Sequence, residues 1–163
     1  MSSVTVRDLT KNYDGAPILE RINLDVAAGS FCTIVGASGC GKSTFLRILL
    51  SQELPSSGQV EVGGEPLPSE PTPDRGIVFQ RYSVFPQLCV EDNLILTREF
   101  AAAPLTGRLF GARRRRAREE VAETLLSIGL MAAKDRYPAQ LSGGMQQRLA
   151  IAQALLMKPK ILL

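Results

Sequence analysis

The sequence contains no histidine. Histidine is the side chain that most readily acts as a general base or proton shuttle near neutral pH, and it is the commonest metal ligand. Mechanisms and metal sites that need a histidine within these 163 residues are therefore excluded.

Long apolar runs are also missing. No segment approaches the roughly 18 apolar residues of a membrane-spanning helix, and the first residues lack the apolar core of a signal peptide. The three cysteines, Cys32, Cys40 and Cys89, cannot all pair, and their spacing matches no metal-binding motif. These features predict a cytosolic protein with reduced thiols.

The composition is that of a soluble globular domain, with 45% hydrophobic and 21% charged residues. The formal net charge of +3 is too small to indicate nucleic acid or an acidic membrane surface by itself.

The pattern of apolar residues changes once within the first 50 residues. Alternating residues at Val4 and Val6, and again over 18–26, predict an antiparallel hairpin or meander. Residues 31–35 form an apolar run typical of a strand buried on both faces. A glycine-rich turn follows at 36–41, and the helix after it has an apolar side that includes Phe45.

Downstream, residues 59–62 predict another strand, and the four prolines in 65–74 predict a stiff surface loop. The pattern turns helical from Gln80. One helical stripe, ending near Gly129, comprises Ala117, Val121, Leu125 and Ile128; a second, closed by Pro159, comprises Leu149, Ala152 and Leu156.

The segment 36–43, GASGCGKS, matches the phosphate-binding pattern G-x-x-x-x-G-K-[ST], with a predicted strand before it and a helix after it. Backbone N–H groups at the positive end of a helix dipole can surround a polyphosphate. Lys42 would contact the β- and γ-phosphates, and the Ser43 hydroxyl would bind Mg²⁺. The expected binding residues are Gly36, Ser38, Gly39, Cys40, Gly41, Lys42, Ser43 and Thr44. The alternative is a chance glycine turn.

A second motif, LSGGMQQR, occupies 141–148. Ser142 is a good N-cap for a helix that runs to about Met157, and Gly143 and Gly144 leave the first amides uncovered for an anion. Taken alone, the motif could equally be a capped turn.

Together the two motifs resemble the nucleotide-binding subunit of ATP-binding cassette (ABC) transporters, whose signature is LSGGQ where this chain has LSGGM. The resemblance implies an α/β P-loop NTPase core with an N-terminal antiparallel β portion and a helical subdomain, incomplete at the C-terminus. The expected parts are the nucleotide-binding core (1–80), the helical subdomain (81–140) and the signature motif with its helix and the start of a further strand (141–163).

The resemblance also implies roles for two more residues. Tyr13 stands where the family has an aromatic residue that stacks on adenine, with packing in the core as the alternative. Gln80 resembles the glutamine that touches Mg²⁺ and the attacking water, with an ordinary polar residue at a strand end as the alternative. Lys42 and Gln80 are then the catalytic residues, and Ser43 and Gln80 hold the metal.

By this resemblance the complete protein binds MgATP and hydrolyses ATP to ADP and phosphate, which drives an importer. The segments RGIVFQRYSVFPQLCVEDN and YPAQLSGGMQQRLAIAQAL look most like importers of nitrate, sulfonates, taurine and related anions. Expected partners are integral-membrane permease subunits, a substrate-binding protein and a second ATP-binding subunit, and no nucleic acid. The permease would hold the subunit on the inner face of the cell membrane.

Residues 158–163 resemble the start of the Walker B strand. The acidic residues and switch histidine that follow it in the family are not in this sequence, so we expect the chain alone to be hydrolysis-deficient and to aggregate or need a partner. A hydrolysis-deficient nucleotide-binding fragment or regulatory subunit is an alternative function. A small P-loop kinase is another, and it would have no use for Ser142.

Arginines occupy 113–116, with Arg108 and Arg118 nearby. Pairs of Arg115 with Glu119 and Arg116 with Glu120 are possible at i,i+4 spacing. A solvated helix end is the main interpretation, and contact with anionic lipid or the membrane subunit is the alternative. Nucleic acid is disfavoured because no aromatic residues interleave the arginines.

Overall fold

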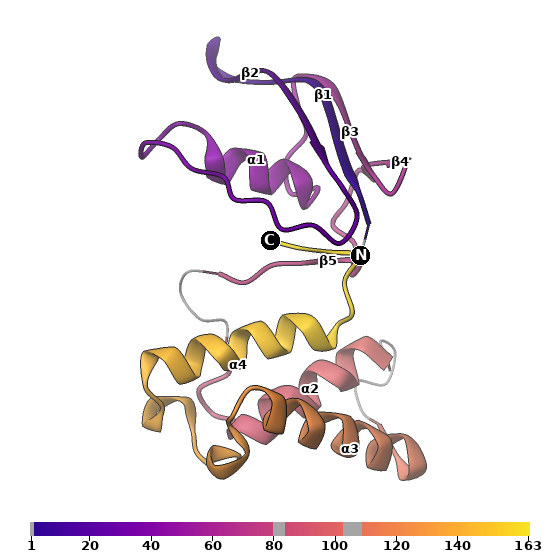
Figure 1. Cartoon of the computed structure of the whole chain (residues 1–163), viewed down its shortest axis with the longest axis vertical. Coiled ribbons are helices and arrows are strands. Elements are labelled where there is room, and N and C mark those ends of the chain that lie inside the picture. Colours follow the sequence, from indigo (N-terminus) through magenta and orange to yellow (C-terminus); the bar gives the residue numbers. More distant parts are fainter. Residues whose placement is uncertain (1, 80–83, 103–108) are drawn as a thin grey trace. The chain divides into compact units, whose positions relative to one another are not determined.

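The structure, a computed structural model, describes residues 2–79, 84–102 and 109–163 (Figure 1). Gln80 and Arg108 lie outside these ranges. The chain divides into two compact units, one comprising residues 1–75 with Leu163 and the other residues 76–162. The expected organisation into the parts 1–80, 81–140 and 141–163 stays a prediction.

The first unit contains a four-stranded sheet in the order β2-β1-β3-β4. Its antiparallel strands are β1 (Val4–Tyr13), β2 (Ala16–Val26), β3 (Ser57–Val62) and β4 (Glu65–Pro66). The predicted alternation at Val4 and Val6 is confirmed, because both side chains are buried. Strands β1 and β2 form an antiparallel pair whose register shifts at three places. The loop predicted over 65–74 is present from residue 67, but Glu65 and Pro66 form the strand β4, where a proline is tolerated because β4 lies at the edge of the sheet.

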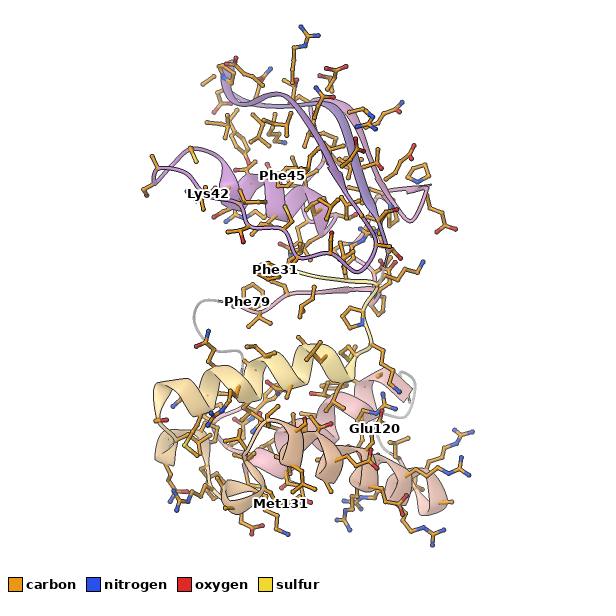
Figure 2. The ribbon with its side chains drawn as sticks, viewed as in Figure 1. Phe31, Lys42, Phe45, Phe79, Glu120 and Met131 are labelled. Carbon is orange, nitrogen blue, oxygen red and sulfur yellow. The ribbon has the colours of Figure 1, made fainter. Side chains whose placement is uncertain are left out.

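Helix α1 (Lys42–Leu49) follows the glycine-rich turn, as predicted. It buries Phe45, Ile48 and Leu49, which recur at three- and four-residue spacing and so share one face. Figure 2 shows Lys42 at the start of this helix and Phe45 one turn later.

The prediction of a buried strand at residues 31–35 is wrong for this structure. The segment has no regular secondary structure, and Phe31 and Val35 are 94% and 84% exposed. A strand requires neighbouring backbone groups to accept and donate its hydrogen bonds. In the described part of the chain, no strand pairs with this segment.

The second unit contains the helices α2 (Val90–Ala102), α3 (Gly111–Ser127) and α4 (Gly143–Leu156). Two short 3₁₀ helices, Met131–Ala133 and Pro138–Gln140, connect α3 to α4. Both predicted stripes are confirmed as core: the buried members are Ala117, Val121, Leu125, Leu149, Ala152 and Leu156, and Ile128 packs against the core half-buried.

A helical pattern is expected from Gln80; among the described residues, α2 begins at Val90, and residues 84–89 before it are not helical. The preceding segment is held in a non-helical conformation by the fully buried side chain of Asn93. Its Oδ1 accepts from the Phe85 amide at 2.8 Å, and its Nδ2 donates to the Leu88 carbonyl at 3.0 Å. Asparagine competes for backbone hydrogen bonds in this way, and it delays the start of the helix.

A second sheet has two short strands, β5 (Arg75–Gly76) and β6 (Ile161–Leu162). The apolar run expected at the end of the chain therefore does form a strand. None of the helices in the described ranges has the length and apolar character needed to cross a membrane.

The predicted ion pairs of α3 are not seen. Among the described residues, Glu120 pairs with Arg98 at 2.8 Å and with Lys158 at 2.9 Å, and Arg115 and Arg116 form no ion pair. The arginines at 113–116 and Arg118 are exposed. Three-dimensional packing thus overrides the i,i+4 spacing, whose pairs contribute only about 0.2–0.5 kcal/mol each.

Candidate nucleotide-binding site

The phosphate-binding motif forms a loop (residues 36–41, hereafter the P-loop) closed by the lysine that follows it. The Nζ atom of Lys42 donates to the carbonyl oxygens of Gly36 at 2.8 Å and Ala37 at 2.6 Å. The ammonium group therefore folds back from the first residue of α1 to the start of the loop (Figure 2). A positive charge on the loop, at the positive end of a helix dipole, is an arrangement that binds an anion.

Gly36 and Gly41 of the loop have little space for a side chain. A Cβ atom on Gly36 would lie 2.7 Å from the Cys40 Sγ atom. Gly41, the N-cap of α1, has a φ of 91°, and its Cβ would lie 2.8 Å from the Leu19 Cδ2 atom. At Gly41 a side chain would meet both a strained backbone conformation and the Ile18 carbonyl oxygen at 2.9 Å, so glycine is favoured there. With glycine at both positions, no side chain covers the backbone at these two points of the loop. A polyphosphate fits such a loop because it can reach the backbone N–H groups directly.

Ser38, Gly39 and Cys40 form the exposed outer part of the P-loop, and Ser43 is exposed on the first turn of α1. Thr44 is half-buried. Within the described residues, no group of three His, Cys, Asp or Glu side chains could hold a metal. The exposed Ser43 side chain presents a hydroxyl oxygen at this site, and Mg²⁺ prefers oxygen ligands.

Tyr13, at the end of β1, is 39% exposed and is not a core residue. Its hydroxyl donates to the Oε1 atom of Glu53, and the Lys11 Nζ atom lies 5.0 Å above its ring centroid. Lys11 also pairs with the same Glu53 oxygen at 3.1 Å. The hydrogen bond from Tyr13, followed by the charge of Lys11, lowers the pKa of the Glu53 carboxyl below its ordinary value, so this group accepts as a carboxylate.

Sequence reasoning missed Lys11 and Glu53. The i,i+2 spacing of Lys11 and Tyr13 could have placed them on one face of a strand. Glu53 gave no such signal, because it reaches Tyr13 only through the folding of α1 against the sheet.

The signature motif lies in the second unit, whereas Tyr13 and the P-loop lie in the first. Ser142 is the N-cap of α4, as predicted, and its Oγ accepts from the Met145 amide at 3.4 Å. Gly143 and Gly144 are exposed, and a Cβ on Gly144 would meet nothing within 4 Å. The N-terminal end of α4 is therefore accessible to another molecule. Gln80 lies outside the described residues, so its role stays a prediction.

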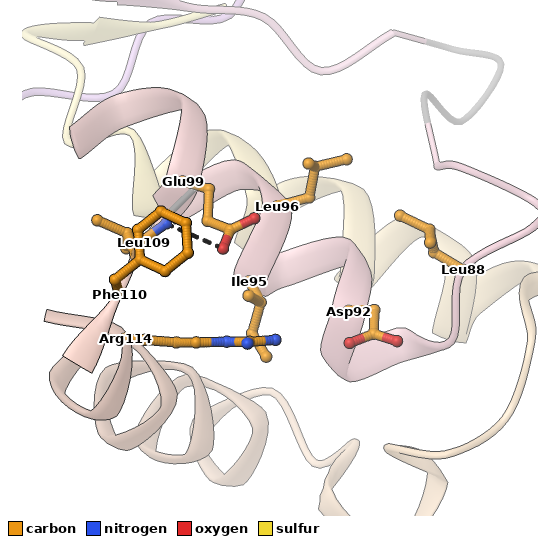
Figure 3. Close-up of a pocket in the computed structure, with 8 residues that line it drawn as sticks. All are labelled: Leu88, Asp92, Ile95, Leu96, Glu99, Leu109, Phe110 and Arg114. Carbon is orange, nitrogen blue, oxygen red and sulfur yellow. Dashed lines mark hydrogen bonds between the residues drawn. The ribbon is translucent and has the colours of Figure 1, made fainter. Parts of the chain in front are cut away.

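The second unit also contains a cavity of about 320 Å³ between α2 and the start of α3 (Figure 3). Asp92 and Glu99 line it with Ile95, Phe110 and Arg114, and Glu99 accepts from the Leu109 amide at 3.2 Å. Two carboxylates at one cavity disfavour a polyphosphate. None of the predicted nucleotide-binding residues lines it, and the P-loop is the better phosphate site.

A glycine-rich loop that opens a helix and carries a lysine ammonium defines a P-loop nucleotide-binding protein. The sequence profile of the family described as "ABC transporter" matches residues 19–163. The chain belongs to the ABC transporter family.

Two curated relatives illustrate the similarity. The chain is 36% identical over 162 residues to the Fe(3+) ions import ATP-binding protein FbpC of Escherichia coli O157:H7, covering 98% of this chain and 44% of that protein. It is 40% identical over 165 residues to the spermidine/putrescine import ATP-binding protein PotA of Mesoplasma florum, covering 97% and 43%. The chain thus spans less than half the length of these two relatives.

The fold is similar to that of a solved ATP-binding cassette. The dimeric post-hydrolysis state of the ATP-binding cassette MJ0796 bound to ADP and Pi is 31% identical to this chain and superimposes with a TM-score of 0.74, covering 98% of this chain and 72% of that one. The expected fold class, an ABC ATPase-like α/β core with an antiparallel β portion and a helical part, is therefore confirmed.

Proposed function

We propose that the chain is the nucleotide-binding part of an importer ATPase subunit that binds MgATP through the P-loop, Lys42, Ser43 and Thr44. The observation that carries the proposal is the position of the Lys42 ammonium, within 2.8 Å of the loop carbonyls of Gly36 and Ala37. The β- and γ-phosphates would replace these carbonyls as partners of the lysine, because a charged acceptor forms the stronger hydrogen bond.

In the complete protein, the bound nucleotide would be hydrolysed to ADP and phosphate. Magnesium supplies charge neutralisation on the phosphate oxygens when it is bound. Lys42 would hold the transferred phosphoryl group, Ser43 would orient the metal, and Gln80 would position the attacking water. Positioning and charge compensation are the main contributions a protein makes to this reaction.

The proposed assembly is a dimer in which the P-loop of one copy faces Ser142, Gly143 and Gly144 of the other. Support comes from the open end of α4, where a side chain on Gly144 would meet no atom within 4 Å. The related cassette MJ0796 is dimeric in its ADP- and Pi-bound structure. The dimer would act with integral-membrane permease subunits and a substrate-binding protein, on the inner face of the cell membrane.

The cargo in this proposal is a small anion such as nitrate, a sulfonate or taurine. The sequence segments around Gln80 and Ser142 favour this cargo. The two relatives described above are instead named as import proteins for Fe(3+) ions and for spermidine/putrescine. Uptake assays of the intact transporter with each of these solutes would decide between them.

Calorimetric titration with MgATP tests nucleotide binding. Lys42→Ala should weaken binding about tenfold to a hundredfold, because a hydrogen bond to a charged group contributes roughly 1.5–3 kcal/mol. Lys134→Ala, which removes a lysine from the second unit, is the matched control and should bind normally. Equal affinities of the Lys42→Ala variant and the unaltered chain would overturn the proposal.

The alternative function, a small P-loop kinase, makes a different prediction. The activity of a kinase should be unchanged by Ser142→Arg, because a kinase has no use for Ser142.

A further inference from the structure

Lys11, Tyr13 and Glu53 form a closed cluster of contacts at the end of β1. Lys11 and Tyr13 are two residues apart at the end of the strand, and their side chains lie together, with the Lys11 Nζ atom 5.0 Å from the Tyr13 ring centroid. The Tyr13 hydroxyl and the Lys11 ammonium share one oxygen of Glu53, and the ammonium also lies over the Tyr13 ring. Each of the three side chains thus contacts the other two.

Two further hydrogen bonds anchor the end of β1 to the residues that follow Glu53. Lys11 Nζ donates to the Leu54 carbonyl at 2.8 Å, and the Asn12 amide donates to the Ser56 hydroxyl at 3.0 Å. The side chains of Lys11 and Glu53 are only 14% and 19% exposed. Solvent and salt screen such a pair less than a surface pair, so Glu53 is a firm support for the Tyr13 hydroxyl.

Tyr13 itself keeps 39% of its surface exposed although its hydroxyl and one ring face are engaged. An aromatic ring with an exposed surface is a stacking platform for a nucleobase. The strand end that carries Tyr13 is connected to the P-loop through Leu19. Lys11 pairs with Leu19 across the sheet, and a Cβ atom on Gly41 would lie 2.8 Å from the Leu19 Cδ2 atom. The turn between β1 and β2 and the loop before α1 lie on the same side of the first unit (Figure 1).

We propose that Glu53 and Lys11 are positioning residues for the adenine base: they fix the Tyr13 ring before nucleotide arrives, so that the base stacks on a platform already in place. This inference rests on the proposed function. Its physical basis is preorganisation, since a ring that is held in place loses less conformational freedom on binding than a ring that is free to rotate. The charge of Lys11 over the ring further draws electron density away from the surface on which the purine would stack.

The experiment compares two probes, MgATP and magnesium tripolyphosphate, which has the phosphate chain and no base. Glu53→Leu and Tyr13→Phe both remove the hydrogen bond and keep the ring. Each should weaken MgATP binding about two- to tenfold, the cost of ordering one side chain, and should leave tripolyphosphate binding unchanged. Glu53→Gln, which keeps an acceptor oxygen, should recover most of the loss. Glu70→Leu, on the exposed proline-rich loop, is the matched control.

The two probes separate a positioning role from a structural one. If Glu53→Leu weakens both probes by the same factor, Glu53 supports the fold of the unit, and the inference is wrong. If Glu53→Leu and Tyr13→Phe both leave MgATP affinity unchanged, it is wrong as well. If the proposed function itself is wrong, the unaltered chain should bind neither MgATP nor magnesium tripolyphosphate. The inferred role of Glu53 would then be wrong as well.

Discussion

Gly41 and Leu19 approach so closely that a Cβ atom on Gly41 would lie 2.8 Å from the Leu19 Cδ2 atom and 2.9 Å from the Ile18 carbonyl oxygen. The N-cap of α1 therefore lies directly against β2, with no room for a side chain between them.

The contact predicts different effects of alanine at two glycines of the same loop. Gly41 and Gly39 have φ values of 91° and 82°, so Ala costs roughly 1–2 kcal/mol of backbone strain at either position. Only at Gly41 would the new methyl group also overlap Leu19, which adds about 1–3 kcal/mol for overpacking. Urea unfolding should therefore show Gly41→Ala to be the less stable variant, and equal losses of unfolding free energy would contradict the proposed contact.

Nucleotide binding should protect Cys40 from alkylation. Cys40 is exposed on the P-loop, and its Sγ lies 3.5 Å from the Lys42 Nζ atom, so a bound polyphosphate would cover it. Cys32 is exposed outside the loop and provides an internal control. Peptide mapping after maleimide treatment should show MgATP slowing the labelling of Cys40 and leaving that of Cys32 unchanged. Equal labelling of Cys40 with and without nucleotide would show that the loop is not occupied.

The third cysteine should react slowly in either condition. Burial raises the pKa of the Cys89 thiol, which lowers the fraction of reactive thiolate at neutral pH. The order of labelling rates therefore reports whether the protein is folded during the assay.

The features predicted correctly from the sequence are those set by neighbours along the chain. The alternation at Val4 and Val6, the stripe through Val121 and Leu125, and the N-cap at Ser142 each depend on local periodicity or on one short-range hydrogen bond. The helix predicted after the glycine-rich turn belongs to this group, whereas the nucleotide-binding role of the P-loop stays a prediction.

The features that were missed depend on distant partners. The apolar run at 31–35 has the composition of a buried strand, but composition states only which residues favour burial and not which backbone will pair with them. Glu53 was missed for a related reason: its contact with Tyr13 joins positions 40 residues apart. Asn93 delayed the start of α2 through hydrogen bonds to a segment for which the sequence predicted a helix.

The stability of the first unit should depend on pH through Glu53. Its pKa is lowered in the folded state from an ordinary value of 4.5 by the hydrogen bond from Tyr13 and the charge of Lys11. A carboxyl of this kind contributes stability above its unfolded-state pKa, and the contribution is lost as the pH falls through the folded-state pKa. Urea unfolding should show the unaltered chain losing more stability than Glu53→Gln below about pH 5. Parallel pH profiles for the two proteins would contradict this assignment.

The arginines at the start of α3 should lower the stability of the helix that carries them. Arg113 lies in the first turn, where the helix dipole is positive, and that turn contains no acidic residue. Replacing Arg113 with Gln removes an unfavourable charge, and replacing it with Glu adds a favourable one, so we expect stability to rise in the order Arg, Gln, Glu, by about 0.3–1 kcal/mol per step. The order should be visible in urea unfolding at low ionic strength and should largely vanish in 1 M salt, where the Debye length is about 3 Å. A stabilisation by Glu that persists in high salt would mean that helix propensity or packing, and not the charge, is responsible.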